Sequence, residues 1–94
     1  MYINRMTINV KPGHMEDVLA LLKENREQTG SNQRIYEIYI GKYDQISLEI
    51  EAEDMAGYEK GWAEWSARPE TPAFREKWLE YTDGGFEEIW RLVE

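Results

Sequence analysis

The chain has 94 residues, of which nineteen are acidic and eleven basic, so its net charge is −8. The absence of cysteine excludes disulfides, thiolate catalysis and cysteine-bound zinc, and the negative charge disfavours nucleic acid and anionic membranes as partners. No apolar run reaches the length of a membrane span and the first residues lack the apolar region of a signal peptide, so we expect one domain over residues 1–94, located in the cytoplasm.

The chain begins with a pattern that predicts a strand and then a helix. In residues 2–10 Tyr2, Met6, Ile8 and Val10 fall on one side and Arg5, Thr7 and Asn9 on the other, which is the period-2 pattern of a strand. Lys11-Pro12-Gly13 breaks this pattern. From Met15 to Leu22 apolar residues recur at the spacing of one helical face, and Gly30 is typical of a helix end.

A hairpin is predicted next. Residues 34–40 and 45–51 both alternate, as strands do, and the four residues between them have the composition of a hairpin loop.

The second half of the chain predicts a helix in two pieces and a last strand. Asp54 is a good N-cap, Arg68-Pro69-Glu70 interrupts the helix, and Thr71 followed by Pro72 restarts it with a capping side chain and a proline at the first helical position. A turn at residues 83–85 precedes a strand over residues 86–93. The aromatic residues of the two helical pieces recur at helical spacing: Tyr58, Trp62, Trp65, Phe74, Trp78 and Tyr81.

The order of elements predicts the fold class. Strand, helix, strand, strand, broken helix and strand, joined by right-handed crossovers, place both helical segments on one side of an antiparallel sheet. We therefore expect an α+β, ferredoxin-like βαββαβ subunit with a broken second helix.

Alternation also predicts which residues face the helices. The helix-covered face is expected to hold Asn4, Met6, Ile8, Val10, Tyr36, Ile38, Ile40, Ile46, Leu48, Ile50, Trp90 and Leu92. The opposite face then mixes apolar with charged residues: Ile3, Arg5, Thr7, Ile35, Glu37, Tyr39, Ser47, Glu49, Glu51, Ile89, Arg91 and Val93. Because an open sheet face should be polar, this mixture predicts a homodimer in which a second sheet covers the face and the arginines meet the glutamates.

Several segments resemble the dimeric α+β barrel proteins, which include antibiotic-biosynthesis monooxygenase and NIPSNAP-type domains. They are Lys11-Pro12-Gly13 after the first strand, Gly41-Lys42-Tyr43-Asp44-Gln45, Tyr58-Glu59 with Trp62, and Pro69-Glu70 before Phe74. The resemblance implies a homodimeric barrel with a pocket between sheet and helices in each subunit. Such proteins include cofactor-free oxygenases, haem-degrading enzymes, cyclases and isomerases, so the fold leaves the function open.

The resemblance points to Asn4 and to a tryptophan. In the oxygenases of this group an asparagine of the first strand faces a tryptophan of the second helix, and Asn4 with Trp62 or Trp65 would occupy those places. Two alternatives stay open: Asn4 bonds to backbone or water near a frayed terminus, and the tryptophans are plain core. Gly57 and Gly61 cost helix stability beside the aromatic stripe, which suggests close packing or space kept free near the rings.

Cofactors are not expected. Haem degraders of this group carry an axial histidine in the segment that corresponds to residues 74–78, which has none. His14 is expected to lie exposed at the start of the first helix. Glu87 and Glu88 are interpreted as solvated charge, and no glycine-rich phosphate loop is present. We predict that no metal, haem or nucleotide copurifies.

Three functions follow from these observations. The leading hypothesis is a pocket for a small apolar or aromatic molecule, lined by Asn4, Tyr58, Trp62, Trp65, Phe74 and Trp78. The first alternative is a cofactor-independent monooxygenase or related oxidoreductase that uses Asn4, Trp65 and a tyrosine donor, with Tyr36, Tyr58 and Tyr81 as candidates. The second is a dimeric accessory or regulatory domain whose own side chains fill the pocket.

Overall fold

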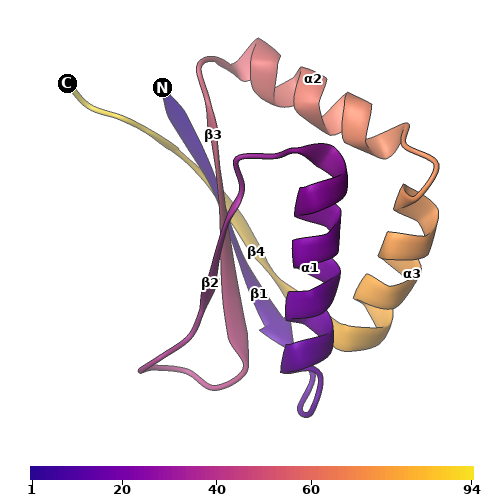
Figure 1. The fold of residues 1–94 in the computed structure, drawn as a ribbon. Coiled ribbons are helices and arrows are strands. Elements are labelled where there is room, and N and C mark those ends of the chain that lie inside the picture. Colours follow the sequence, from indigo (N-terminus) through magenta and orange to yellow (C-terminus); the bar gives the residue numbers. More distant parts are fainter.

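Four antiparallel strands and three helices form two layers in the computed structural model, which describes residues 1–94 (Figure 1). In chain order the elements are β1 (Tyr2–Val10), α1 (Met15–Thr29), β2 (Arg34–Glu37), β3 (Gln45–Ala52), α2 (Met55–Ser66), α3 (Thr71–Tyr81) and β4 (Thr82–Arg91). The strand order is β2-β3-β1-β4, and all three helices cover the same face. The predicted ferredoxin-like fold with a broken second helix is confirmed. None of the helices is both long and apolar enough to span a membrane.

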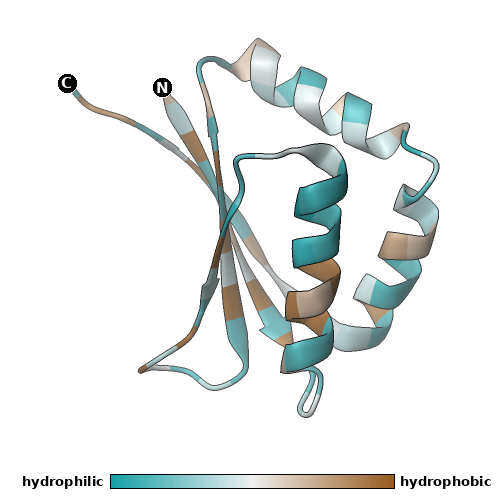
Figure 2. Ribbon diagram, in the orientation of Figure 1, coloured by the Kyte–Doolittle hydropathy of each residue, from teal (hydrophilic) through white to brown (hydrophobic).

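The hydrophobic core is concentrated at the end of the molecule where α1 begins. Its buried members come from α1 and the middle of the sheet: Val10, Val18, Leu22, Ile46 and Leu48. Figure 2 shows apolar residues in the first half of α1, whereas its second half is hydrophilic. No residue of α2 is buried. The end of the molecule beneath α2 is therefore packed less tightly than the end beneath the start of α1.

The break between α2 and α3 is stabilised by hydrogen bonds at the helix ends. The side chain of Asp54 accepts a bond of 2.7 Å from the Gly57 amide, as its N-cap position predicted. Thr71 differs from the prediction, because it is the first residue of α3 and does not cap that helix. Its hydroxyl donates instead to the Trp65 carbonyl at 2.6 Å, which satisfies a carbonyl in the last turn of α2.

The predicted faces of β2 are reversed in the structure. Ile35 pairs with Leu48 and packs against the core, whereas Tyr36 pairs with Ser47 on the open face. The strand ends at Glu37, before Tyr39 and Ile40, which lie almost fully exposed in the β2–β3 loop. A four-residue edge strand takes its register from β3, and its own alternation is too short to determine which face is buried.

The predicted faces of β4 are also reversed. Trp90 pairs with Ile3 on the open face, whereas Glu87 pairs with Met6 and Ile89 with Asn4 on the helix side. The register shifts near the start of the strand, where three steps along β4 match two along β1. Gly85 sits at this irregularity with a φ of 155°, and a Cβ there would lie 2.1 Å from the Thr7 carbonyl oxygen. The bulge sets the register of β4, and in this register the rings of Phe86 and Trp90 lie on the open face.

Candidate functional site

A cavity of about 500 Å³ lies between the helix side of the sheet and helices α2 and α3. Its lining includes five of the six residues proposed from the sequence: Tyr58, Trp62, Trp65, Phe74 and Trp78. Polar side chains from α1 and the segment before β2 line it as well, among them Asn25 and Gln33. We call this space the aromatic cleft.

The rings of the aromatic cleft form a continuous series along α2 and α3. Ring centroids of successive members lie 6.4, 5.5, 5.4 and 5.6 Å apart from Tyr58 to Trp78, with the first three contacts edge-to-face and the last one stacked. These spacings are typical of favourable aromatic pairs. All five side chains are only partly buried. The rings thus pack against one another and still leave open space beside them.

Trp65 is the most firmly oriented ring of the series. Its indole N–H donates to the Asn25 side chain at 3.0 Å, and its ring meets those of Trp62 and Phe74 at 86° and 89°. The Arg75 guanidinium lies 5.1 Å from the centre of the same ring, within the range of a cation–π contact. A ring held in this way offers a fixed surface to a bound molecule.

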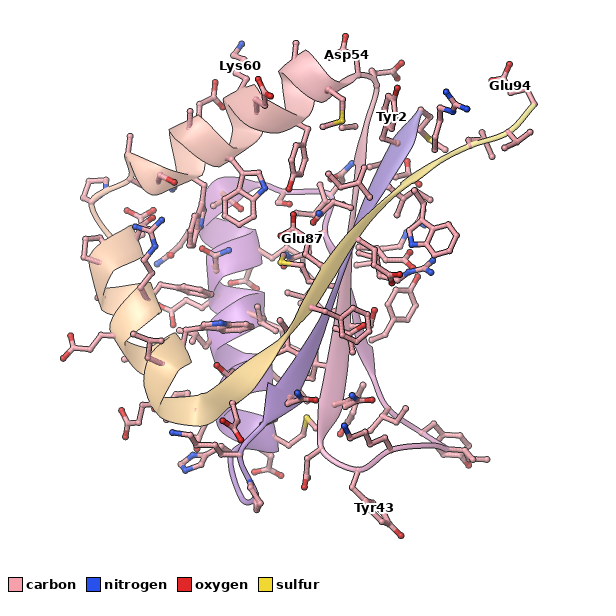
Figure 3. All side chains as sticks on the ribbon, turned by 180° about the vertical axis from the view of Figure 1, so that it is seen from behind. Tyr2, Tyr43, Asp54, Lys60, Glu87 and Glu94 are labelled. Carbon is pink, nitrogen blue, oxygen red and sulfur yellow. The ribbon has the colours of Figure 1, made fainter.

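Asn4 lies behind the cleft and reaches it through Tyr58. It is 2% exposed, and its amide nitrogen donates to the Tyr58 hydroxyl at 3.2 Å. That hydroxyl donates in turn to the Glu87 carboxylate at 2.8 Å. Figure 3 shows Glu87 on the side of β4 that faces the helices, whereas Lys60 points away from the sheet on the outer side of α2. Asn4 is therefore bonded to a side chain of α2 rather than to backbone, but it is absent from the cavity lining.

The chain of bonds through Tyr58 has electrostatic consequences. Burial raises the pKa of the Tyr58 hydroxyl above its ordinary value, and the hydrogen bond to Glu87 raises it further. The hydroxyl thus stays protonated at neutral pH and acts as a donor. The other amide atom of Asn4, Oδ1, is buried without a hydrogen-bond donor, and so is Oε1 of Gln33. Two acceptors at or behind the cleft have no protein partner, which is unusual for buried polar atoms.

The two glycines of α2 border the aromatic cleft. A Cβ added at Gly61 would meet no atom within 4 Å, whereas one at Gly57 would lie 3.2 Å from the capping oxygen of Asp54. The sequence offered two explanations for these glycines, close packing or space kept free near the rings. Gly61 fits the second explanation, because the space beside it is open, and Gly57 fits the first.

Two arginines lie at the rim and were not proposed from the sequence. Arg68 is engaged by Glu70, with Nε 2.5 Å from the carboxylate, and by the Gln28 carbonyl at 2.8 Å. The hydrogen bond from Arg68 holds the pKa of Glu70 below its ordinary value. Arg75 makes one long bond, 3.4 Å from Nη2 to the Ser66 hydroxyl. No pattern in the sequence marks either arginine, because both are placed by the turn between α2 and α3.

Other candidate residues are not brought to the cleft. His14 contacts Asp17 at 2.9 Å and stacks on Tyr81 near the start of α1. Tyr36 is on the open face of the sheet, so Tyr58 alone of the three candidate tyrosines reaches the site. No three histidine, aspartate or glutamate side chains converge in an arrangement that would hold a metal ion.

Solved structures share this fold over nearly the whole chain. An uncharacterised NIPSNAP domain protein from Burkholderia xenovorans aligns with a TM-score of 0.86 at 12% identity, over 99% of this chain and 95% of its own. A NIPSNAP family protein from Agrobacterium tumefaciens gives 0.87 at 12% identity, over 99% and 86%. An antibiotic biosynthesis monooxygenase gives 0.75 at 15% identity, over 100% of both chains.

Comparisons based on sequence give no further assignment. No family model matches the chain, and no curated protein matches it. Structural similarity at these low identities establishes a common fold and leaves the activity open. The resemblance inferred from the sequence is confirmed at the level of the fold: the chain shares its ferredoxin-like fold with NIPSNAP and antibiotic biosynthesis monooxygenase structures.

Proposed function

We propose that the aromatic cleft binds a small, flat and largely apolar molecule. The observation that carries this proposal is the partial burial of five rings around about 500 Å³ of space. That volume lies within the range of small-molecule sites, which combine many apolar groups with a few polar ones. Here the polar groups include the Tyr58 hydroxyl, the Gln33 side-chain oxygen and the arginines at the rim.

Binding of 2-naphthol tests this proposal. We expect it to quench tryptophan fluorescence and to give a saturable heat of binding by calorimetry. Trp65→Ala should abolish binding while circular dichroism shows the fold intact. Trp90→Phe is the control, since Trp90 lies on the open face of the sheet and should leave the affinity unchanged. Absence of binding to the wild type, or binding that survives in a Trp65→Ala, Asn4→Ala double variant, would contradict the proposal.

A cofactor-independent monooxygenase is the second candidate, supported by the bond from Asn4 to Tyr58 at the edge of the cleft. One of the solved structures with this fold is an antibiotic biosynthesis monooxygenase. In such a reaction a polycyclic phenol and O₂ would yield a quinone and water, with one oxygen atom entering the ring and the other leaving as water. The Tyr58 O–H, which donates to Glu87 in the structure, would turn to donate a hydrogen bond to the developing charge on oxygen.

Oxygen consumption with a panel of polycyclic phenols separates the two candidates. Turnover that falls at least about tenfold in both Tyr58→Phe and Asn4→Ala supports the enzyme. Saturable binding of the same phenols without oxygen uptake supports a binding protein. If neither oxygen uptake nor saturable binding is observed, the results support an accessory domain with no ligand.

We also propose that the protein is a homodimer whose two sheets meet through their open faces. The corrected register strengthens the support for this arrangement, because it places three large rings on that face: Tyr36, Phe86 and Trp90, which are between 46% and 57% exposed. Large rings that lie half-exposed on an open sheet face are typical of a surface that meets another protein. A cytoplasmic location stays a prediction.

A further inference from the structure

We propose that the ligand of the aromatic cleft is an aromatic carboxylate, whose anionic group is bound by Arg75 at the rim. This inference rests on the proposed function and adds the chemical class of the ligand. It begins from Arg75 itself, a residue of α3 that lines the cleft and belongs to none of the five ion pairs in the structure.

The guanidinium of Arg75 is positioned but not neutralised. It lies over the Trp65 ring at 5.1 Å, and the single hydrogen bond it makes is the long one to Ser66. Arginine has five N–H donors arranged as a fork that matches the two oxygens of a carboxylate. Most of these donors have no acceptor in the protein, so Arg75 is available to a ligand that rests against Trp65.

The other charged residues that line the cleft are already paired, and the Glu87 carboxylate, which accepts from Tyr58, does not line it. Arg68 is paired with Glu70, and Glu64 lies 3.9 Å from Lys60 one turn earlier on α2. The lining therefore carries one uncompensated positive charge, which matches a monoanion better than a phosphate with nearly two negative charges.

The overall charge of the protein sharpens this inference. A net charge of −8 repels any anion at long range. A carboxylate that binds more tightly than a neutral molecule of the same shape must therefore owe this preference to a local cation, and the cleft offers Arg75.

A pair of matched probes tests the inference. 2-Naphthoate and 2-naphthamide have the same ring and nearly the same shape, but only the first is charged at neutral pH. We expect the wild type to bind 2-naphthoate about fivefold or more tightly than 2-naphthamide by isothermal titration calorimetry. Arg75→Gln should remove this preference.

Lys77→Gln is the control for charge alone. Lys77 lies on the same helix, is exposed and does not line the cleft, so its substitution changes the net charge equally without touching the rim. The preference for 2-naphthoate should persist in this variant. Arg75→Lys should retain part of the preference, because it keeps the charge and loses the fork.

The outcomes separate this inference from the proposed function. Equal affinity of the wild type for both probes overturns the role of Arg75 and leaves the aromatic cleft as a binding site. The role of Arg75 is also overturned if Arg75→Gln and Lys77→Gln lose the preference for 2-naphthoate equally, since the preference would then depend on the net charge alone. If neither probe binds, the proposed function fails, and the inference fails with it.

Discussion

The Tyr58 hydroxyl links two residues that are far apart in the sequence. It accepts from Asn4, 54 positions earlier, and donates to Glu87, 29 positions later. The inward direction of Asn4 was predictable, because alternation in a long strand is a local property. The role of Glu87 was not, since a carboxylate beside another glutamate has the pattern of solvated charge until the strand register is known.

Replacement of Tyr58 by phenylalanine should destabilise the protein. The change removes the bond to Glu87 and leaves the buried Asn4 amide without its partner, so we expect a loss of about 1–3 kcal/mol in the free energy of unfolding, measured with urea. Tyr81→Phe is the matched control, because no side-chain hydrogen bond of the Tyr81 hydroxyl is found in the structure. Equal effects of the two substitutions would show that the hydroxyl bonds of Tyr58 contribute nothing specific.

The raised pKa of Tyr58 predicts a pH dependence of stability. Above its ordinary value of 10.0 the unfolded chain has lost this proton while the native state still holds it. The resulting stabilisation is complete below pH 10 and is lost as the pH rises through the native pKa. The free energy of unfolding of the wild type should therefore fall more steeply above pH 10 than that of Tyr58→Phe. Parallel curves for the two proteins would contradict this prediction.

At the level of elements, the glycines of α2 lower its helix stability where it borders the cleft. A glycine inside a helix costs about 1 kcal/mol relative to alanine, and the space beside Gly61 is open. Gly61→Leu should therefore keep or raise the melting temperature while its side chain fills the cleft and abolishes 2-naphthol binding. Ala63→Leu on the exposed part of the same helix is the control and should bind normally. Normal binding by Gly61→Leu would place the ligand elsewhere.

The sequence predicted the elements better than their faces. Helix α1, the cap at Asp54 and the break near Pro69 follow from short-range patterns, and the structure has all three. The faces of β2 and β4 depend on pairing with distant strands and on a bulge, which local alternation does not encode. In β4 the alternation predicted Trp90 on the buried face, whereas the register places it on the open one.

For the whole molecule, the corrected faces change the expected contacts between subunits. Arg5 pairs with Glu49 of its own chain at 2.9 Å and lies over Trp90 at 5.7 Å. The register places Glu37 and Arg91 on the side of the sheet that faces the helices. Their predicted role in ion pairs on the open face is therefore wrong. Aromatic contacts centred on Trp90 are now the expected source of dimer affinity.

Light scattering at micromolar concentration should give the mass of a dimer. Trp90→Ala should weaken dimerisation at least about tenfold, measured by sedimentation, because aromatic residues at the centre of an interface contribute most of its affinity. Leu79→Ala is the control, since Leu79 is equally apolar and 74% exposed but lies on α3. A monomeric wild type, or an unchanged affinity in Trp90→Ala, would rule out this face as the interface.

Helix α2 covers the cleft without contributing a single buried residue. Five side-chain hydrogen bonds near its two ends attach it to the rest of the protein; they involve Tyr58, Trp65 and Ser66 of the helix. An element with so little buried area opens at a lower free energy than the core beneath α1. The backbone amides of α2 should thus exchange with deuterium faster than those of α1, and a molecule that occupies the cleft should slow them. Brief lifting of α2 would then widen the route into the site.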